Sequence, residues 1–164
     1  MSVDAPRLSA MADTFTVERA TTIDAPAATV YPHVADFHAW TAWSPWEEVD
    51  PSMERSYTGA DRGVGARYAW SGNKKAGRGS MEIVRADEPS RVEIDLQFEK
   101  PFKSRNDIVL ALTETAAGQT HVTWTMIGPV TFMTRLMGLF MKMDKLVGGD
   151  FEKGLAKLKA VSEA

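Results

Sequence analysis

Histidine acts as a general base or metal ligand near neutral pH, and the chain has three histidines: His33, His38 and His121. Neighbours on one helix face are three or four residues apart, whereas His33 and His38 are five apart. His121 falls on the outward face of a predicted strand, beside Thr123 and Thr125. We therefore interpret all three histidines as surface residues.

Sequence motifs for catalysis and metal binding are missing. The chain contains no Gly-x-Ser-x-Gly elbow, His-Glu-x-x-His helix, phosphate-binding loop or dinucleotide fingerprint. Its acidic residues mostly alternate outward on predicted strands, so spacing pairs no two of them as acid and base. Zero cysteines exclude thiol nucleophiles and cysteine-containing metal sites, and no His, Asp and Glu cluster has ligand spacing. We predict no metal and no cofactor.

Large, adaptable apolar side chains are the most distinctive chemical feature, because the chain has five tryptophans and nine methionines. Trp40, Trp43 and Trp46 recur at intervals of three, which places them near one side of a helical turn. Met133 and Met137 lie on a segment that is already apolar nearly all round. Ordinary packing explains any single one of these residues, but together they favour a pocket for an irregular hydrophobic ligand.

Two polar side chains share an inward strand face with aliphatic residues: Arg19 and Asn106. A buried polar group needs a partner. For Arg19 the alternatives are a structural acid, water at the rim of the sheet, or the acidic or carbonyl end of a ligand. The sequence leaves these alternatives open.

The predicted ligand-binding set combines these polar residues with the aromatic and methionine side chains expected to face the interior. Its members are Arg19, Trp40, Trp43, Tyr68, Trp70, Met81, Phe98, Asn106, Trp124, Met133, Leu136, Met137 and Phe140. If the pocket is catalytic, Tyr57 and Tyr68 are the phenols that could donate or accept a proton.

The elements that must position these residues follow from the hydrophobic period. Alternation of apolar and polar residues predicts seven strands, at 15–23, 53–57, 66–71, 80–86 and 91–99 and around 108–112 and 122–126. Two short helices are predicted after the first strand, at 26–35 and within 37–46. A helical apolar stripe runs from Val130 to Leu158, with Gly148-Gly149 as a point where it could bend. A curved antiparallel sheet that grips one long helix follows.

Length and charge set the remaining limits. One domain is expected for 164 residues; we predict that it spans 14–164 and that 1–13 form a disordered extension. Twenty-two acidic and 19 basic residues give a net charge of −3, the wrong sign for a nucleic-acid binder. No stretch has the composition of an export signal or a membrane span, so a cytoplasmic location without membrane insertion is expected.

Motifs spread along the chain together carry a family resemblance. They include Phe15-x-Val-x-Arg, Ile23-Asp-Ala-Pro-Ala, Val34-Ala-Asp-Phe, Trp40-x-x-Trp-Ser-Pro-Trp, Gly63-x-Gly-x-x-Tyr-x-Trp, Gly77-x-Gly-x-Met-x-Ile, Leu96-x-Phe-x-x-Pro-Phe, Thr120-x-Val-x-Trp-x-Met-x-Gly and Gly149-Asp-Phe-x-x-Gly-Leu. From Phe15 to Glu163 the sequence resembles the START-like SRPBCC superfamily, polyketide cyclase/dehydrase branch. The resemblance implies an α+β helix-grip fold with a deep hydrophobic cavity between sheet and C-terminal helix.

Fold alone does not settle the function of such a protein. The leading hypothesis is a protein that binds a small hydrophobic, lipid- or polyketide-like molecule. The runner-up is a cofactor-independent polyketide cyclase or dehydrase that uses the same cavity. A chaperone-stimulating interaction module comes third, because it needs an exposed apolar patch on the outer sheet face, where Glu93, Asp95, Gln97 and Glu99 are instead charged or polar. A homodimer is left open.

Overall fold

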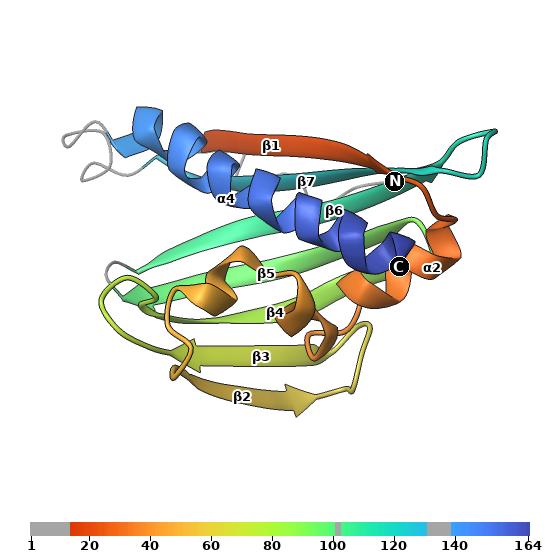
Figure 1. The fold of residues 1–164 in the computed structure, drawn as a ribbon. Coiled ribbons are helices and arrows are strands. Elements are labelled where there is room, and N and C mark those ends of the chain that lie inside the picture. Colours follow the sequence, from red (N-terminus) through yellow and green to blue (C-terminus); the bar gives the residue numbers. More distant parts are fainter. Residues whose placement is uncertain (1–13, 101–102, 131–138) are drawn as a thin grey trace.

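The computed structural model describes residues 14–100, 103–130 and 139–164, with the backbone alone at 48 and 139–143. Seven strands form one antiparallel sheet that curves around a long C-terminal helix (Figure 1). The strands are β1 (Thr14–Ile23), β2 (Glu54–Gly59), β3 (Ala66–Ser71), β4 (Arg78–Asp87), β5 (Arg91–Lys100), β6 (Ser104–Glu114) and β7 (Thr120–Pro129). Their spatial order is β1-β7-β6-β5-β4-β3-β2. The predicted helix-grip fold is confirmed.

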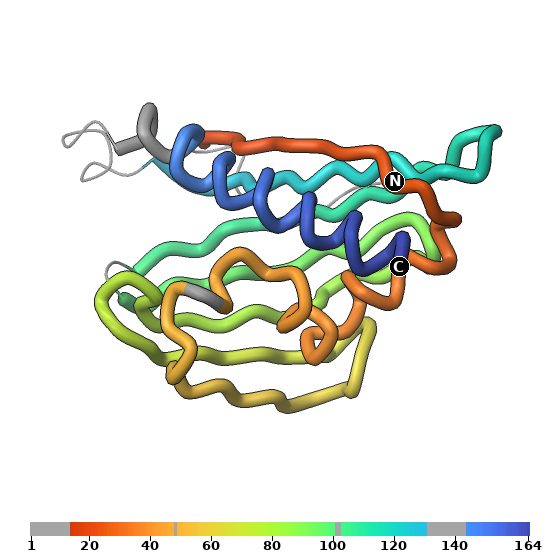
Figure 2. The backbone as a smooth tube through the Cα atoms, viewed as in Figure 1, coloured from red at the N-terminus to blue at the C-terminus, as the bar shows by residue number. Residues whose placement is uncertain are grey.

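Short helical segments connect β1 to β2, and Figure 2 shows this stretch running in front of the sheet, on the same face as the long C-terminal helix. They are α2 (Ala27–Val34) and the 3₁₀ helices η1 (Ala39–Ala42) and η2 (Pro45–Glu48). The second predicted helix is therefore split in two. Pro45 has no N–H to donate and occupies the first turn of η2, where Ser44 accepts a hydrogen bond from the Trp46 amide.

The long helix α4 (Leu139–Glu163) lies across the concave face of the sheet. Its predicted start at Val130 is not confirmed, because Val130 is not helical and residues 131–138 lie outside the described residues. The helix continues through Gly148-Gly149 without a break. A Cβ atom at Gly148 would lie 2.3 Å from Nη2 of Arg19, so glycine here permits close approach of α4 to β1.

The core lies between α4 and the inward residues of the central strands. Phe151, Leu155 and Leu158 are almost fully buried on one face of α4. They pack with Leu110 of β6 and other buried strand residues. This arrangement matches the period of the predicted helical stripe and fixes the position of α4 over the sheet.

Candidate ligand-binding cavity

A cavity of about 180 Å³ lies inside the grip, between the concave sheet face and the helical segments. A single water molecule needs only about 10–15 Å³ by the same measure. Six of the predicted residues line the cavity: Trp40, Tyr68, Trp70, Met81, Phe98 and Trp124. The sequence therefore identified one wall of it, formed by alternate inward positions of β3, β4, β5 and β7 together with η1.

Other lining residues were missed. They are Phe37, Ser44, Trp46, Glu47, Met53, Lys75, Ala76, Leu96, Ile108, Met126, Val147 and Phe151. Several of these, such as Leu96 and Ile108, follow the same inward alternation as the predicted ones and could have been found from that signal. Glu47 and Lys75 lie in the segments before β2 and β4, where no period indicates direction.

A cluster of stacked and edge-on aromatic rings makes the cavity wall rigid. Trp124 stacks on Phe151 with ring centroids 4.0 Å apart and an interplanar angle of 8°. The rings of Trp40 and Trp46 approach Trp124 edge-on, each with centroids 5.9 Å away. Such pairs add stabilisation beyond their buried area. The indole N–H of Trp40 is also fixed, donating to the Val34 carbonyl at 3.0 Å.

Arg19 is not among the lining residues. Its Nη2 lies 3.1 Å from Oδ2 of Asp144, and its Nε lies 2.9 Å from Oε2 of Glu152, both on α4. The hydrogen bonds with Arg19 also lower the pKa of the Asp144 carboxyl. Of the alternatives that the sequence left open, pairing with structural acids is the one observed, and the prediction of a ligand contact is unsupported.

Trp43 and Asn106 are also absent from the cavity lining. Trp43 is fully buried behind the wall, and its indole N–H donates to the His33 carbonyl at 2.9 Å. Asn106 Nδ2 donates to Ser104 Oγ at 3.3 Å. A Cβ atom at Gly128 would lie only 2.1 Å from Oδ1 of Asn106, so the Asn106 amide packs directly on the backbone of β7.

The predicted lid residues on the apolar helical segment cannot be placed. Met133, Leu136 and Met137 lie outside the described residues, as does the side chain of Phe140. Of the described part of α4, Val147 and Phe151 line the cavity. A role of the methionines as a lid stays a prediction.

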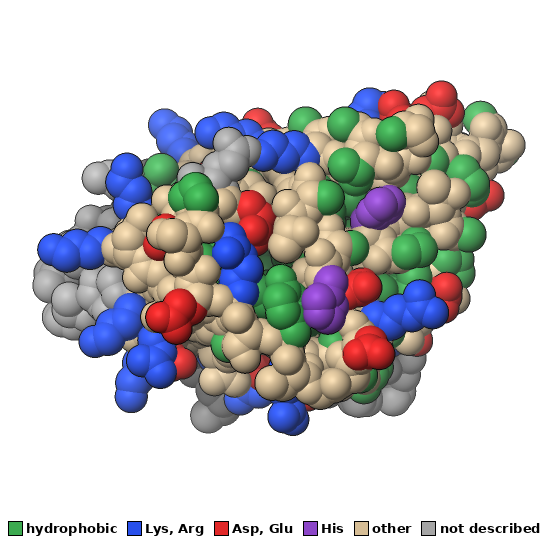
Figure 3. Space-filling view, turned by 60° about the horizontal axis from the view of Figure 1, so that its bottom comes forward, with side chains coloured by type: hydrophobic (Ala, Val, Ile, Leu, Met, Phe, Trp, Pro, Cys, Tyr) green, Lys and Arg blue, Asp and Glu red, His purple; other side chains and the backbone are tan. Residues whose placement is uncertain are grey.

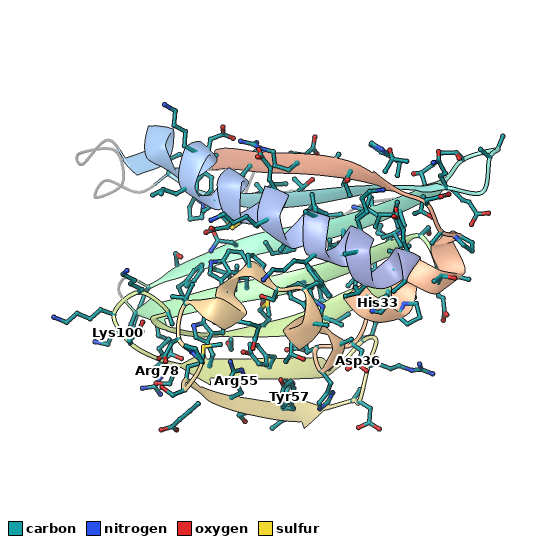
Figure 4. The ribbon with its side chains drawn as sticks, viewed as in Figure 1. His33, Asp36, Arg55, Tyr57, Arg78 and Lys100 are labelled. Atoms are coloured by element: carbon teal, nitrogen blue, oxygen red, sulfur yellow. The ribbon has the colours of Figure 1, made fainter. Side chains whose placement is uncertain are left out.

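Polar groups meet the cavity along one side. The Glu47 carboxylate accepts a hydrogen bond from Nη2 of Arg55 at 2.8 Å, and Nη1 of Arg55 donates to the Met53 carbonyl. Burial raises the pKa of the nearby Tyr68 phenol to about 12, so this group keeps its proton across the neutral range. Figure 4 shows Arg55 and Tyr57 on the β2 side of the sheet.

Tyr57, the second predicted phenol, belongs to a separate, shallower pocket of about 90 Å³. Its ring stacks on His38 with centroids 4.1 Å apart. Nδ1 of His38 lies 3.0 Å from Oδ1 of Asp36, and the His38 side chain is 56% exposed.

His121 is exposed as predicted, whereas His33 is only half-exposed.

The described residues contain no group of three or more His, Cys, Asp and Glu side chains that could hold a metal ion. Within the same part of the chain, no helix has the length and apolar composition needed to cross a membrane.

Solved structures of similar architecture show how common this fold is. A protein from Chromobacterium violaceum shares 14% identity over 92% of this chain and 99% of its own, with a TM-score of 0.65. One from Thermobifida fusca shares 22% identity over 90% and 92%, also with a TM-score of 0.65. The Aha1 dimer from Colwellia psychrerythraea shares 16% identity over 90% and 96%, with a TM-score of 0.60. At these identities the likeness shows the fold alone.

Sequence comparison defines the family. A search of curated proteins gives no significant match. The family model described as polyketide cyclase/dehydrase and lipid transport matches residues 14–163. That span covers all seven strands and α4. The chain therefore belongs to the polyketide cyclase/dehydrase and lipid-transport family, of the START-like SRPBCC type.

Proposed function

We propose that the protein binds a small hydrophobic molecule in the cavity between the sheet and α4, as a carrier or sensor. The observation that carries this proposal is the cavity itself, whose walls are aromatic and aliphatic side chains with few polar groups. Such concave apolar sites, with a small number of placed polar groups, are typical of small-molecule binding. The cytoplasmic location expected from the sequence stays a prediction.

The side chains that line the cavity favour a space that stays open and accepts a ligand over one that closes by side-chain rearrangement. Trp70 and Met81 line the cavity and remain only partly buried, so they keep apolar surface that a ligand can remove from water. The rigid stack of Trp124 on Phe151 resists closure, because both rings are held by further edge contacts with Trp46. An apolar ligand thus gains burial without a large rearrangement.

A charge placed on the cavity wall should weaken binding of an apolar ligand. We expect Met81→Glu to weaken binding of a neutral fluorescent probe, N-phenyl-1-naphthylamine, by about tenfold or more, because the ligand must displace a hydrated carboxylate. Ser80→Glu is the matched control, since Ser80 is adjacent on β4 and pairs with Ala69 and Gln97 on the outer face. Titrations would follow probe fluorescence and tryptophan quenching.

Both variants must give the circular dichroism spectrum of the unchanged protein before affinities are compared. Equal affinities in the Met81→Glu and Ser80→Glu proteins would place the binding site outside the cavity. An unchanged protein that binds no apolar probe would contradict the proposal itself.

A second candidate function, cofactor-independent cyclase or dehydrase chemistry, is favoured by Tyr68. Its phenol lines the cavity, and its raised pKa of about 12 keeps it a proton donor rather than a base at neutral pH. Such a donor can stabilise a carbonyl oxygen that gains negative charge during an aldol or elimination step. The family description names this chemistry beside lipid transport.

Tyrosine replacement separates catalysis from binding. If the cavity is catalytic, Tyr68→Phe should remove most turnover of poly-β-keto thioesters while probe affinity changes little, because one hydroxyl is lost from an apolar wall. Tyr57→Phe is the control, since Tyr57 lines the separate shallow pocket. Product formation would be followed by mass spectrometry. Turnover that survives Tyr68→Phe would exclude this phenol as the donor.

The outer sheet face gives the interaction-module hypothesis no support. On β5, Glu93 is paired with Arg85 and Arg91, and Asp95 is held by Arg105 through two hydrogen bonds of 3.0 and 2.9 Å. Asp95, expected to be solvated on this face, is only 8% exposed because Arg105 covers it. The described part of β5 therefore presents ion pairs rather than an apolar patch.

A further inference from the structure

The cavity carries one charge that nothing in its described lining compensates. Glu47 and Lys75 are the lining residues with a formal charge at neutral pH. The Glu47 carboxylate is neutralised by Arg55 at 2.8 Å, and both side chains are largely buried. Among the described residues, no carboxylate pairs with the Lys75 ammonium. The electrostatic balance of the cavity is therefore positive.

Lys75 belongs to a turn that is anchored to the cavity wall. Oδ1 of Asn73 accepts hydrogen bonds from the amides of Lys75 at 3.0 Å and Ala76 at 2.9 Å. The carbonyl of Ala76 accepts the indole N–H of Trp70, which also lines the cavity, at 2.9 Å. These bonds fix the backbone of Lys75 at the rim, while its flexible side chain can move toward a ligand.

The acid that is hydrogen-bonded to this turn is Asp50. Oδ2 of Asp50 accepts the Asn73 amide at 2.8 Å, and Oδ1 accepts both the amide and the hydroxyl of Ser52. These hydrogen bonds lower the pKa of the Asp50 carboxyl, that from Asn73 most. Asp50 therefore stays ionised and holds the turn through its hydrogen bond with the Asn73 amide, and among the described residues no ion pair joins it to Lys75.

The same end of the sheet carries further cationic side chains, among them Arg78, whose Nε lies 3.5 Å from Oε1 of Glu99. The turn between β3 and β4 and the C-terminal end of β5 lie together at this end, since Ser71 pairs with Arg78 and Arg78 with Lys100. Figure 4 shows Arg78 and Lys100 at this end, and Figure 3 shows Lys and Arg side chains gathered there. On a chain with net charge −3, this concentration would attract anions toward the rim.

We infer that the ligand is an amphiphile with an anionic head group, bound with its apolar part against the tryptophan wall and its head at Lys75. This inference rests on the proposed function, because it assigns the chemical class of the cavity's ligand. Trp70 and Phe98 supply the apolar surface beside the rim, with ring centroids 5.8 Å apart. A carboxylate, sulfate or phosphate head near Lys75 would form a charge-assisted hydrogen bond at the edge of an apolar wall.

Two ligands that differ only in the head group test the inference. Decanoate and 1-decanol would each displace N-phenyl-1-naphthylamine from the full chain at neutral pH. We expect the unchanged protein to prefer decanoate about fivefold, the effect of one solvent-exposed ion pair, because Lys75 is an exposed residue at the rim. Lys75→Gln should remove this preference and leave decanol affinity unaltered, and Lys75→Arg should keep it. Raising the salt concentration should shrink it.

Lys74→Gln is the matched control, because Lys74 is an exposed neighbour with the same charge that does not line the cavity. A preference that survives Lys75→Gln, or that falls equally in both variants, would overturn the assignment to Lys75. If the unchanged protein binds decanol as tightly as decanoate, the anionic class is wrong while the proposed function stands. Failure of both ligands and the probe to bind would overturn both.

Discussion

Replacing Phe151 with alanine is expected to lower the free energy of unfolding by about 3–5 kcal/mol and to enlarge the cavity. Phe151 is fully buried, lines the cavity, and stacks on Trp124 with centroids 4.0 Å apart. The change removes apolar burial and leaves one face of the Trp124 ring without its partner. Urea denaturation of the ligand-free protein, followed by tryptophan emission, measures the loss.

The same variant should bind bulkier apolar ligands than the unchanged protein does, because the deleted ring adds to the open volume. Phe151→Leu is the conservative control: it keeps an apolar side chain there, and a smaller loss of stability is expected. A stability loss below about 1 kcal/mol for Phe151→Ala would show that the neighbouring rings collapse into the space. Unaltered ligand size preference would mean that Phe151 does not limit the site.

Leu155→Ala, one turn further along α4, should cost about 2–5 kcal/mol of unfolding free energy without changing ligand affinity. Leu155 is 2% exposed and packs in the core but does not line the cavity. Its truncation therefore leaves an internal void rather than a larger binding site. Denaturation with and without bound probe, at equal probe concentration, distinguishes the two effects.

The pair of variants separates the core function of α4 from its binding function. If Leu155→Ala alters probe affinity as much as Phe151→Ala does, the helix moves as a body and the two functions are not separable by residue. If neither variant changes affinity, α4 does not form a wall of the occupied site.

The positions of the strands, and the face of the sheet to which each side chain points, could be predicted from the sequence. The alternation of apolar and polar residues that indicates both is a local pattern. Val92, Ile94 and Leu96 alternate with polar residues, and the structure buries all three on one face of β5. Trp40, spaced by three from its neighbours, also lies where a helical turn would place it, in the cavity wall. Alternation fixes which way a side chain points once the strand is known.

The contacts that inward-facing residues make could not be predicted from the sequence, because their partners are distant along the chain. Arg19 was correctly placed on the inner face, yet its partner Asp144 is 125 residues away. Phe151 lies within the predicted helical stripe and is buried, but the period of the stripe does not distinguish a residue packed in the core from one that lines a cavity. Lys75 reaches the cavity because its turn is tied to Trp70 and Asn73, a geometry without a sequence period.

The strand order also determines how the chain must fold. β2 to β7 follow one another as neighbours, so each can pair with a strand just synthesised. Among the described strands, however, β1 pairs only with β7, in a register that joins Thr14 to Pro129 and Ile23 to Thr120. β1 is synthesised before the other strands but can pair only after β7 has been made. The pairing closes a loop of roughly a hundred residues between the two strands. Closure of the grip is a late, long-range event, and such non-local pairing slows folding relative to helical proteins of this size.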